Sequence, residues 1–151
     1  MRERVKSWEV VCTSCGETQP VKHPEIECVR CSHPLRVDVE IPVPRGSFGE
    51  FAKPGRRGLW KYQPLLPFPE SIDPVTLGEG GTPIVPLDNW GRLIGVPNIY
   101  AKLEHVSPTG SFKDRGASVL VTRLRELGVR NAVEDSSGNA GASIAASLSS
   151  N

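Results

Sequence analysis

Four cysteines near the start of the chain restrict its fold more than any other feature. They form two pairs, Cys12-x2-Cys15 and Cys28-x2-Cys31, with twelve residues between the pairs. Each pair bends the backbone so that two thiolates point at one ion, and this spacing is typical of a tetrahedral zinc ribbon. Four thiolates leave no open coordination position. The sequence therefore predicts a structural zinc rather than a catalytic one.

Two other interpretations of the cysteines stay open at this point. The ribbon could keep four reduced thiols without a metal, whereas a thioredoxin-like redox pair is disfavoured because neither pair lies in a β-α-β pattern. Short strands are expected at residues 8–11 and 37–41, on either side of the cysteines. His23 and His33 are spare candidate ligands, but their neighbouring prolines favour exposed turns.

The overall charge and hydropathy exclude several classes of function. Eighteen basic and seventeen acidic residues give a net charge of +1, and no basic block predicts a nucleic-acid surface. No apolar run approaches the ~20 residues that a membrane helix requires, and the first residues lack the apolar core of a secretion signal. We therefore expect no nucleic-acid partner, no membrane span and a cytoplasmic protein, whose reducing compartment disfavours disulfides.

The chain is expected to have three parts. A zinc-ribbon-like module covers residues 1–41, and a linker or arm rich in proline and glycine covers residues 42–75, with an apolar stretch at 59–67 that packs on another surface. In residues 76–151, the patterns predict strands at 84–87, 99–103 and 132–133 and helices at 112–127 and 140–148. This order predicts an α/β class with a right-handed, parallel β-α-β unit. Both faces of a parallel sheet must be covered by helices, and the elements predicted here are too few to cover them. We therefore expect an incomplete domain.

Two segments of this third part combine into a candidate site. The run SPTGSFKDRG at residues 107–116 places Lys113 on a tight turn where a helix opens, with Ser111 as its cap and Gly128 at its end. The run EDSSGNAGAS at residues 134–143 is a turn of small polar residues that opens a second helix. A lysine beside such an anion-binding helix start suits an aldehyde cofactor and a substrate that carries a carboxylate.

Four ordered motifs resemble the threonine synthase family: LGEGGTP at 77–83, KLE at 102–104, PTGSFKDRG at 108–116 and SGN at 137–139. The resemblance extends over nearly the whole chain, but only over the front part of a complete enzyme of the family. It implies the first β-α-β part of a fold type II enzyme that uses pyridoxal 5′-phosphate, after an N-terminal ribbon that many members share. The implied reaction converts O-phospho-L-homoserine and water to L-threonine and phosphate.

The same resemblance implies roles for individual residues. Lys113 would bind the cofactor aldehyde as a Schiff base and then move protons on the substrate, as a general base and acid. Asn139 would hydrogen-bond the phenolic oxygen of the cofactor, and Phe112 would wall its pocket. Asp114 and Arg115 are expected to lock the lysine turn. The substrate carboxylate would be held by the turn residues Ser136, Ser137, Gly138, Asn139 and Ala140.

The chain departs from the family pattern in two ways. Ala140 stands where many threonine synthases have a hydroxyl residue, which leaves open a different fold type II lyase or synthase. The downstream glycine-rich loop that binds the cofactor phosphate is absent from the 151 residues, as is the hydroxyl facing the ring nitrogen, so weak cofactor binding is expected. A zinc-ribbon module with an inactive catalytic remnant is the other alternative. The expected partners are a small-molecule amino-acid substrate and, as an assembly, a homodimer.

Overall fold

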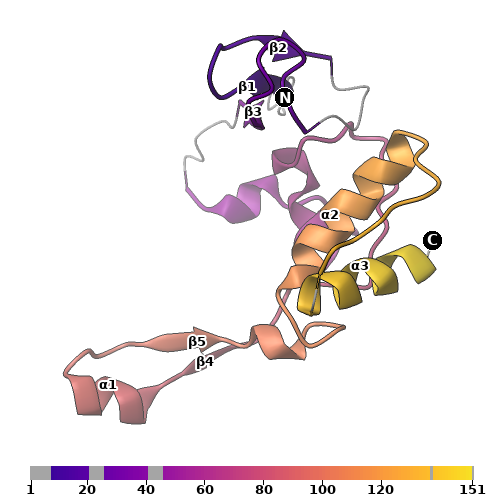
Figure 1. The fold of residues 1–151 in the computed structure, drawn as a ribbon. Coiled ribbons are helices and arrows are strands. Elements are labelled where there is room, and N and C mark those ends of the chain that lie inside the picture. Colours follow the sequence, from indigo (N-terminus) through magenta and orange to yellow (C-terminus); the bar gives the residue numbers. More distant parts are fainter. Residues whose placement is uncertain (1–7, 21–25, 41–45, 137, 151) are drawn as a thin grey trace. The chain divides into compact units, whose positions relative to one another are not determined.

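The computed structural model describes residues 8–20, 26–40, 46–136 and 138–150. The chain divides into two compact units, each built from segments that are not contiguous in the sequence. Unit 1 contains the described residues of 1–56, 60–73 and 123–130, and unit 2 contains those of 57–59, 74–122 and 131–151. Figure 1 labels the helices and strands, which give a mixed α/β protein as the sequence predicts.

The first part of unit 1 is a small antiparallel sheet. Its strands β1 (Trp8–Cys12), β2 (Thr18–Gln19) and β3 (Leu35–Val39) are arranged in the order β2-β1-β3 (Figure 1). The strand expected at 8–11 is confirmed. The strand expected at 37–41 begins two residues earlier, since Leu35 already pairs with Cys12, and its predicted end at Ile41 lies outside the described residues.

The segment expected to be a linker or arm, residues 42–75, contains two 3-10 helices, although the sequence predicted no element there. These are η1 (Phe48–Phe51) and η2 (Gly58–Leu65), and η2 is kinked at Tyr62. The expectation that the apolar stretch at 59–67 packs on other residues is confirmed by Trp60, which is buried and whose ring centroid lies 5.4 Å from that of Phe68.

Unit 2 contains a two-stranded antiparallel ladder with a short helix in its connection. Strand β4 (Ile84–Pro86) pairs with β5 (Tyr100–Lys102), and α1 (Asp88–Ile94) lies between them in the sequence. Gly95 ends α1 in the left-handed conformation, with φ of 69°. Both predicted strands are thus confirmed, each one or two residues shorter than expected.

The predicted parallel β-α-β unit is wrong for this chain. Strand β5 pairs antiparallel with β4, and residues 129–136 form no strand. The segment expected to form a buried strand at 132–133 is exposed, and the side chain of Val133 is fully exposed to solvent. A strand requires a hydrogen-bonded neighbour and covered faces, and the described residues offer neither at this position.

Two helices complete the described elements: α2, whose last residues belong to unit 1, and α3, which lies in unit 2. Helix α2 (Lys113–Glu126) matches the predicted helix closely, and Gly128 follows its end with φ of 72°. Helix α3 (Asn139–Ser149) also lies where expected, and its buried residues are the serines Ser143 and Ser147 rather than large apolar side chains. Among the described helices, none has both the length and the apolar character that crossing a bilayer requires.

One face of α2 packs on the chain segment that precedes the glycine-rich loop. Ala117 and Val121 are buried on this face. Beside them, the Ser118 hydroxyl donates to the Val75 carbonyl at 2.7 Å, and the Val75 amide donates to the Thr122 hydroxyl at 3.0 Å. Buried hydroxyls that bond to backbone groups in this way fix the register of the helix against the segment.

Candidate active site and metal centre

The four cysteines form one compact cluster of thiols. Their sulfur atoms all lie within 4.8 Å of one another, with Cys12 Sγ 3.5 Å from Cys31 Sγ and Cys15 Sγ 3.7 Å from Cys28 Sγ. These distances exclude disulfide bonds, and all four thiols are free. A tetrahedral site with Zn–S bonds of ~2.3 Å places its sulfurs ~3.8 Å apart. The cluster therefore has the composition and spacing of a structural zinc site.

The two cysteine turns have the same backbone geometry. In the first turn, the Cys12 amide donates to the Glu17 carbonyl at 2.9 Å and the Gly16 amide donates to the Cys12 carbonyl at 3.3 Å. In the second turn, Cys28 makes the equivalent bonds with His33 and Ser32, each at 2.8 Å. Ser32 even adopts the same left-handed conformation as Gly16, which few residues with a side chain do.

Backbone amides of both turns also point at sulfur. The amides of Ser14 and Cys15 each donate to Cys12 Sγ at 3.4 Å, and the Arg30 amide donates to Cys28 Sγ at 3.4 Å. The Cys15 amide in particular lowers the pKa of the Cys12 thiol to about 6 against the opposing effect of burial. A thiolate is the form that binds a metal, so these amides favour metal binding by Cys12.

The side chain of Gln19 joins β2 to the second cysteine turn. It is buried, and its Oε1 accepts a hydrogen bond from the Val29 amide at 2.9 Å. Sequence patterns gave no signal for this contact, since a glutamine in a short strand is ordinarily an exposed residue. His33 is exposed and its ring contacts the Cys31 carbonyl, as expected for a turn histidine, while His23 lies outside the described residues.

Lys113 is the first residue of α2, and its side chain is exposed. Its amino nitrogen lies 5.0 Å from the ring centroid of Phe112, whose side chain is itself 57% exposed. The Ser111 hydroxyl accepts a hydrogen bond from the Lys113 amide at 3.2 Å, as the predicted cap would. Within the described part of the chain, no carboxylate pairs with the Lys113 amine, which leaves it accessible to an aldehyde.

Asp114 links the lysine turn to α3. Its carboxylate is buried, accepts from the Thr109 amide at 2.8 Å and from the Thr109 hydroxyl, and accepts from the Ser143 hydroxyl at 2.7 Å. Burial raises the pKa of this carboxyl, but these hydrogen bonds outweigh it and hold the pKa below its ordinary value. The prediction that Asp114 locks the lysine turn is confirmed.

Arg115 locks the turn from its other side. Its guanidinium binds the Glu104 carboxylate through two hydrogen bonds of 2.8 and 2.9 Å, and Thr82 donates its hydroxyl to the same carboxylate at 2.6 Å. Arg115 first, and then Thr82, lower the pKa of Glu104 to about 2. The ion pair joins α2 to residues of two other motifs, LGEGGTP and KLE.

The glycine-rich loop of residues 77–83 packs tightly around the same arginine. Glu79 is buried, and its carboxylate accepts from the Leu77 amide at 2.9 Å and from the Thr76 hydroxyl. Gly80 has φ of 88°, and a side chain there would lie 2.6 Å from the Leu59 amide nitrogen and 3.0 Å from the Arg115 guanidinium. Only glycine allows this approach.

The predicted substrate turn precedes α3. Asn139 begins the helix and is exposed, and Ser136 is half-buried with its hydroxyl accepting from the Gly138 amide at 3.3 Å. Ala140 lies in the first turn of α3, and Ser137 lies outside the described residues. The Asp114–Ser143 hydrogen bond therefore holds the first turns of α3 against the helix start that carries Lys113.

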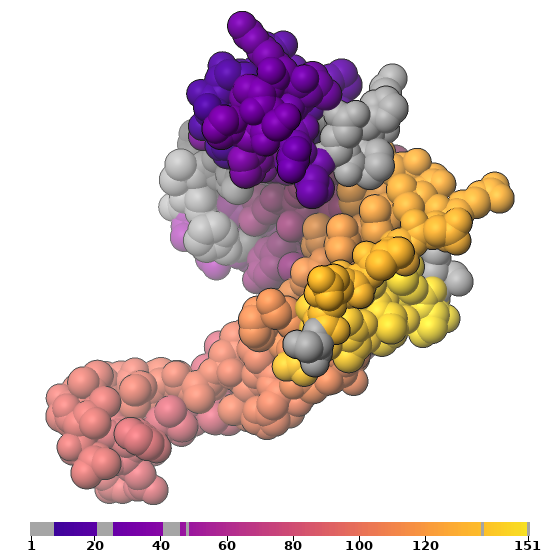
Figure 2. Space-filling model, viewed as in Figure 1, coloured from indigo at the N-terminus to yellow at the C-terminus, as the bar shows by residue number. Residues whose placement is uncertain are grey.

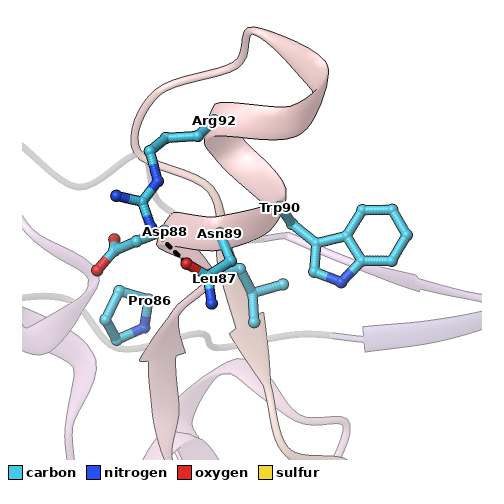
Figure 3. Close-up of a pocket in the computed structure, with 6 residues that line it drawn as sticks. All are labelled: Pro86, Leu87, Asp88, Asn89, Trp90 and Arg92. Atoms are coloured by element: carbon cyan, nitrogen blue, oxygen red, sulfur yellow. Dashed lines mark hydrogen bonds between the residues drawn. The ribbon is translucent and has the colours of Figure 1, made fainter.

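A separate shallow hollow lies beside α1. Figure 3 shows its lining residues, and its volume is about 370 Å³. Asp88 and Arg92 give it charges of both signs, and Trp90 is largely exposed. None of the predicted site residues lines this hollow.

The surrounding segment exposes several large apolar side chains. Figure 2 shows how much of residues 84–100, coloured rose, lies on the surface. The large apolar side chains exposed there are Ile84, Trp90, Leu93, Ile94, Val96 and Tyr100. Because a lone two-stranded ladder is only marginally stable in water, this segment depends on its connections to the rest of unit 2.

Comparison with known proteins assigns a family to the part of the chain that contains these motifs. Residues 75–149 match the family described as pyridoxal-phosphate dependent enzyme. This part of the chain belongs to that family. The match starts at Val75, just before the glycine-rich loop, and extends through Lys113 and the predicted substrate turn to the end of α3.

The chain is also similar to several proteins named threonine synthase. The threonine synthase of Methanocaldococcus jannaschii is 38% identical over 136 residues, which are 89% of this chain and 33% of the relative. The threonine synthase of Methanosarcina acetivorans is 36% identical over 91% of the chain and 33% of the relative. That of Halalkalibacterium halodurans is 44% identical over 58% of the chain and 25% of the relative. The chain thus spans about a third of the length of these relatives.

Several contacts in this family segment were not predicted from the sequence. The sequence motifs contain Thr82, Glu104 and Arg115, but their spacing fits no helical or strand period that would indicate mutual contact. The partners of Asp114 are hidden in the same way, because Thr109 and Ser143 are common cap and helix residues. The motif order was the available signal, since motifs that lie far apart in sequence often meet at one site.

Proposed function

We propose that the chain supplies the lysine and substrate-turn part of a threonine synthase-like enzyme that uses pyridoxal 5′-phosphate. The observation that carries the proposal is the buried Asp114 carboxylate, which ties the Lys113 end of α2 to the first turns of α3. The similarity to threonine synthases at 36–44% identity supports the choice among family members. The proposed reaction converts O-phospho-L-homoserine and water to L-threonine and phosphate.

The donor set of these segments fits the cofactor and an amino-acid substrate. The exposed Lys113 amine suits a covalent bond to the cofactor aldehyde, and Phe112 beside it offers an apolar wall. Exposed Asn139 suits the phenolic oxygen of the cofactor. Ser136, Gly138 and Ala140 place hydroxyl and amide donors at a helix N-terminus, where a substrate carboxylate is favoured.

The residues divide the chemistry between binding and proton transfer. When bound, pyridoxal phosphate supplies an electron sink for charge that develops on the substrate carbons. Lys113 would accept and return protons at those carbons, because it lies at the helix start that Asp114 connects to the first turns of α3. Asn139 and the turn donors would orient the substrate so that the proton to be moved faces Lys113.

Covalent trapping of the cofactor tests this assignment directly. The protein is mixed with pyridoxal phosphate, reduced with borohydride and mapped by mass spectrometry for modified lysines. We expect preferential modification at Lys113 and its loss in Lys113→Ala. Lys61→Ala is the matched control, since the Lys61 amine lies 4.8 Å from the ring of its neighbour Tyr62, much as Lys113 lies over Phe112. If the cofactor labels Lys61 and Lys113 equally in the protein without substitutions, the proposal is refuted.

Product analysis separates the proposed substrate from the alternatives. Cofactor-loaded protein is incubated with O-phospho-L-homoserine, and release of threonine and phosphate is measured. Cofactor binding without these products would favour another fold type II lyase or synthase. Metal binding without cofactor binding would favour a ribbon attached to an inactive catalytic remnant.

A structural zinc ion, a homodimer and a cytoplasmic location complete the proposal. The zinc rests on the sulfur distances, which match tetrahedral coordination by Cys12, Cys15, Cys28 and Cys31. The cytoplasmic location rests on the similarity to threonine synthases and on the free thiols, which suit a reducing compartment. Sedimentation of the protein gives the oligomeric state.

A further inference from the structure

The half-buried Thr109 and the buried Asp114 and Ser143 form a polar cluster between the lysine turn and α3. The Thr109 hydroxyl lies 3.0 Å from the Ser143 hydroxyl, and both donate to the same oxygen of the Asp114 carboxylate. The Thr109 amide donates to the other oxygen at 2.8 Å. Asp114 and Ser143 are almost completely buried, with exposed fractions of 1% and 0%. All these contacts lie within unit 2.

The cluster holds a negative charge without a basic partner. Among the described residues, the donors to Asp114 are hydroxyl and amide groups, and no lysine or arginine pairs with it. A buried charge is costly unless every lone pair is satisfied by well-placed donors. The carboxylate therefore tolerates little displacement of Thr109 or Ser143, and it acts as a stiff connection between the two segments.

The position of each member relates the cluster to the proposed site. Asp114 directly follows Lys113 at the start of α2. Ser143 lies four residues after Asn139 on α3, which is about one helical turn along the same face. Thr109 belongs to the tight turn that leads into the lysine. Each of the two halves of the proposed site is thus connected to the carboxylate through one short segment.

We infer that Thr109, Asp114 and Ser143 are positioning residues, which set the distance between the Lys113 end of α2 and the first turn of α3, which carries Asn139 and Ala140 of the proposed substrate turn. The inference rests on the proposed function for its consequence in chemistry, but the mechanical connection can be tested without cofactor. A displacement of ~1 Å of reacting groups costs ~100-fold in rate. Loss of either hydroxyl should therefore weaken the lysine chemistry without removing any group that touches the substrate.

The decisive variants are Ser143→Ala and Thr109→Val, compared with Ser118→Ala. Ser118 is a matched control because its hydroxyl is equally buried and also donates a hydrogen bond, to the Val75 carbonyl at 2.7 Å. It lies on α2, five residues beyond Lys113, and does not contact α3 through that bond. Thr109→Ser keeps the hydroxyl and is the conservative rescue.

The first measurement is amide hydrogen exchange of the full chain without cofactor. We expect Ser143→Ala to speed exchange on both sides of the cluster, at residues 109–115 and at 139–143. Thr109→Val should act on the same two segments, whereas Thr109→Ser should not. Faster exchange confined to the segment that carries the substitution would overturn the inference, because the two segments would then be positioned independently.

The second measurement is borohydride trapping of pyridoxal phosphate, with modification of Lys113 expressed relative to Lys61. We expect Ser143→Ala and Thr109→Val to lower this ratio by roughly tenfold or more, and Ser118→Ala and Thr109→Ser to leave it within about twofold. Equal losses in Ser143→Ala and Ser118→Ala would contradict a positioning role. If the protein without substitutions shows no preferential labelling of Lys113 over Lys61, the proposed function fails. The hydrogen-exchange experiment then still decides whether the cluster couples the two segments.

Discussion

At the scale of single residues, the Glu104 carboxylate provides a test through pH. Arg115 and Thr82 lower its pKa from 4.5 to about 2 in the folded protein. A lowered pKa means that the folded state holds the charged form, so its contribution to stability is complete above pH 4.5 and is lost as the pH falls toward 2. We expect Glu104→Gln to show a smaller loss of stability over this pH range, measured by urea unfolding followed by circular dichroism.

The control for this prediction is an exposed ion pair. Glu17→Gln removes the partner of Arg30, whose contact is 3.4 Å long and lies on the surface. Surface ion pairs contribute little to stability, so this variant should keep the pH dependence of the original protein. If Glu104→Gln and the original protein lose stability in parallel as the pH falls, the Arg115–Glu104 pair does not hold the turn.

Some residue roles could be read from the sequence and others could not. A lysine at a helix start after a tight turn is visible in SPTGSFKDRG, because glycine, serine and proline mark the turn. The expectation that Asp114 and Arg115 lock that turn came with the family resemblance, and their hydrogen bonds confirm it. Their partners Glu104 and Ser143 lie 11 and 29 residues away in the sequence, and no local period reveals such contacts.

At the scale of elements, two glycines of unit 2 should respond in opposite ways to alanine. Gly80 has φ of 88° and no room for a side chain beside the Leu59 amide, so Gly80→Ala should destabilise the protein by about 1–3 kcal/mol. Gly116 lies inside α2 with open space around it, so Gly116→Ala should stabilise by about 0.5–1 kcal/mol. Urea unfolding measures both changes. If Gly80→Ala leaves the stability unchanged, the loop can move away from Leu59 and Arg115 without loss of stability.

Elements that form through local sequence patterns were predicted correctly, whereas elements that depend on tertiary neighbours were not. Helix α2 was predictable because its apolar residues recur on one face and Gly128 ends it. The strand predicted at 132–133 is wrong because two apolar residues form a strand only beside a hydrogen-bonded neighbouring strand, and Val133 is exposed here. The 3-10 helices at residues 58–65 were not predicted because prolines usually indicate irregular structure. A helix nevertheless accepts proline in its first turn.

At the scale of the whole molecule, the order of the ribbon and of the enzyme segment was predictable from motif order. The cysteine spacing indicated the cluster that the structure contains, and the motifs after residue 75 coincide with the family match. The division into two compact units was not predictable, because each unit combines segments far apart in the sequence and α2 contributes to both. Such interleaving depends on packing rather than on local composition.

Metal removal is the prediction that belongs to this scale. Unit 1 contains the cysteine cluster, and β1–β3 bury little besides its sulfurs, so the ribbon should depend on bound zinc for stability. We expect the protein to bind one zinc ion per chain, and a chelator to abolish hydrogen-exchange protection in β1 and β3. Residues 113–122 and 139–149 of unit 2 should keep their protection, because their buried contacts involve Val75, Asp114 and Ser143 rather than the metal.

A matched pair of substitutions separates metal binding from a nonspecific effect of the chelator. Cys28→Ser removes a buried ligand and should release the zinc, whereas Ser14→Ala changes an exposed neighbour whose backbone amide still points at Cys12. We expect Cys28→Ser without chelator to reproduce the exchange pattern of the chelated protein, and Ser14→Ala to keep the zinc. Loss of protection in both units on chelation would mean that the units unfold together. Their stability would then be one quantity, and the ribbon would help to stabilise the lysine site.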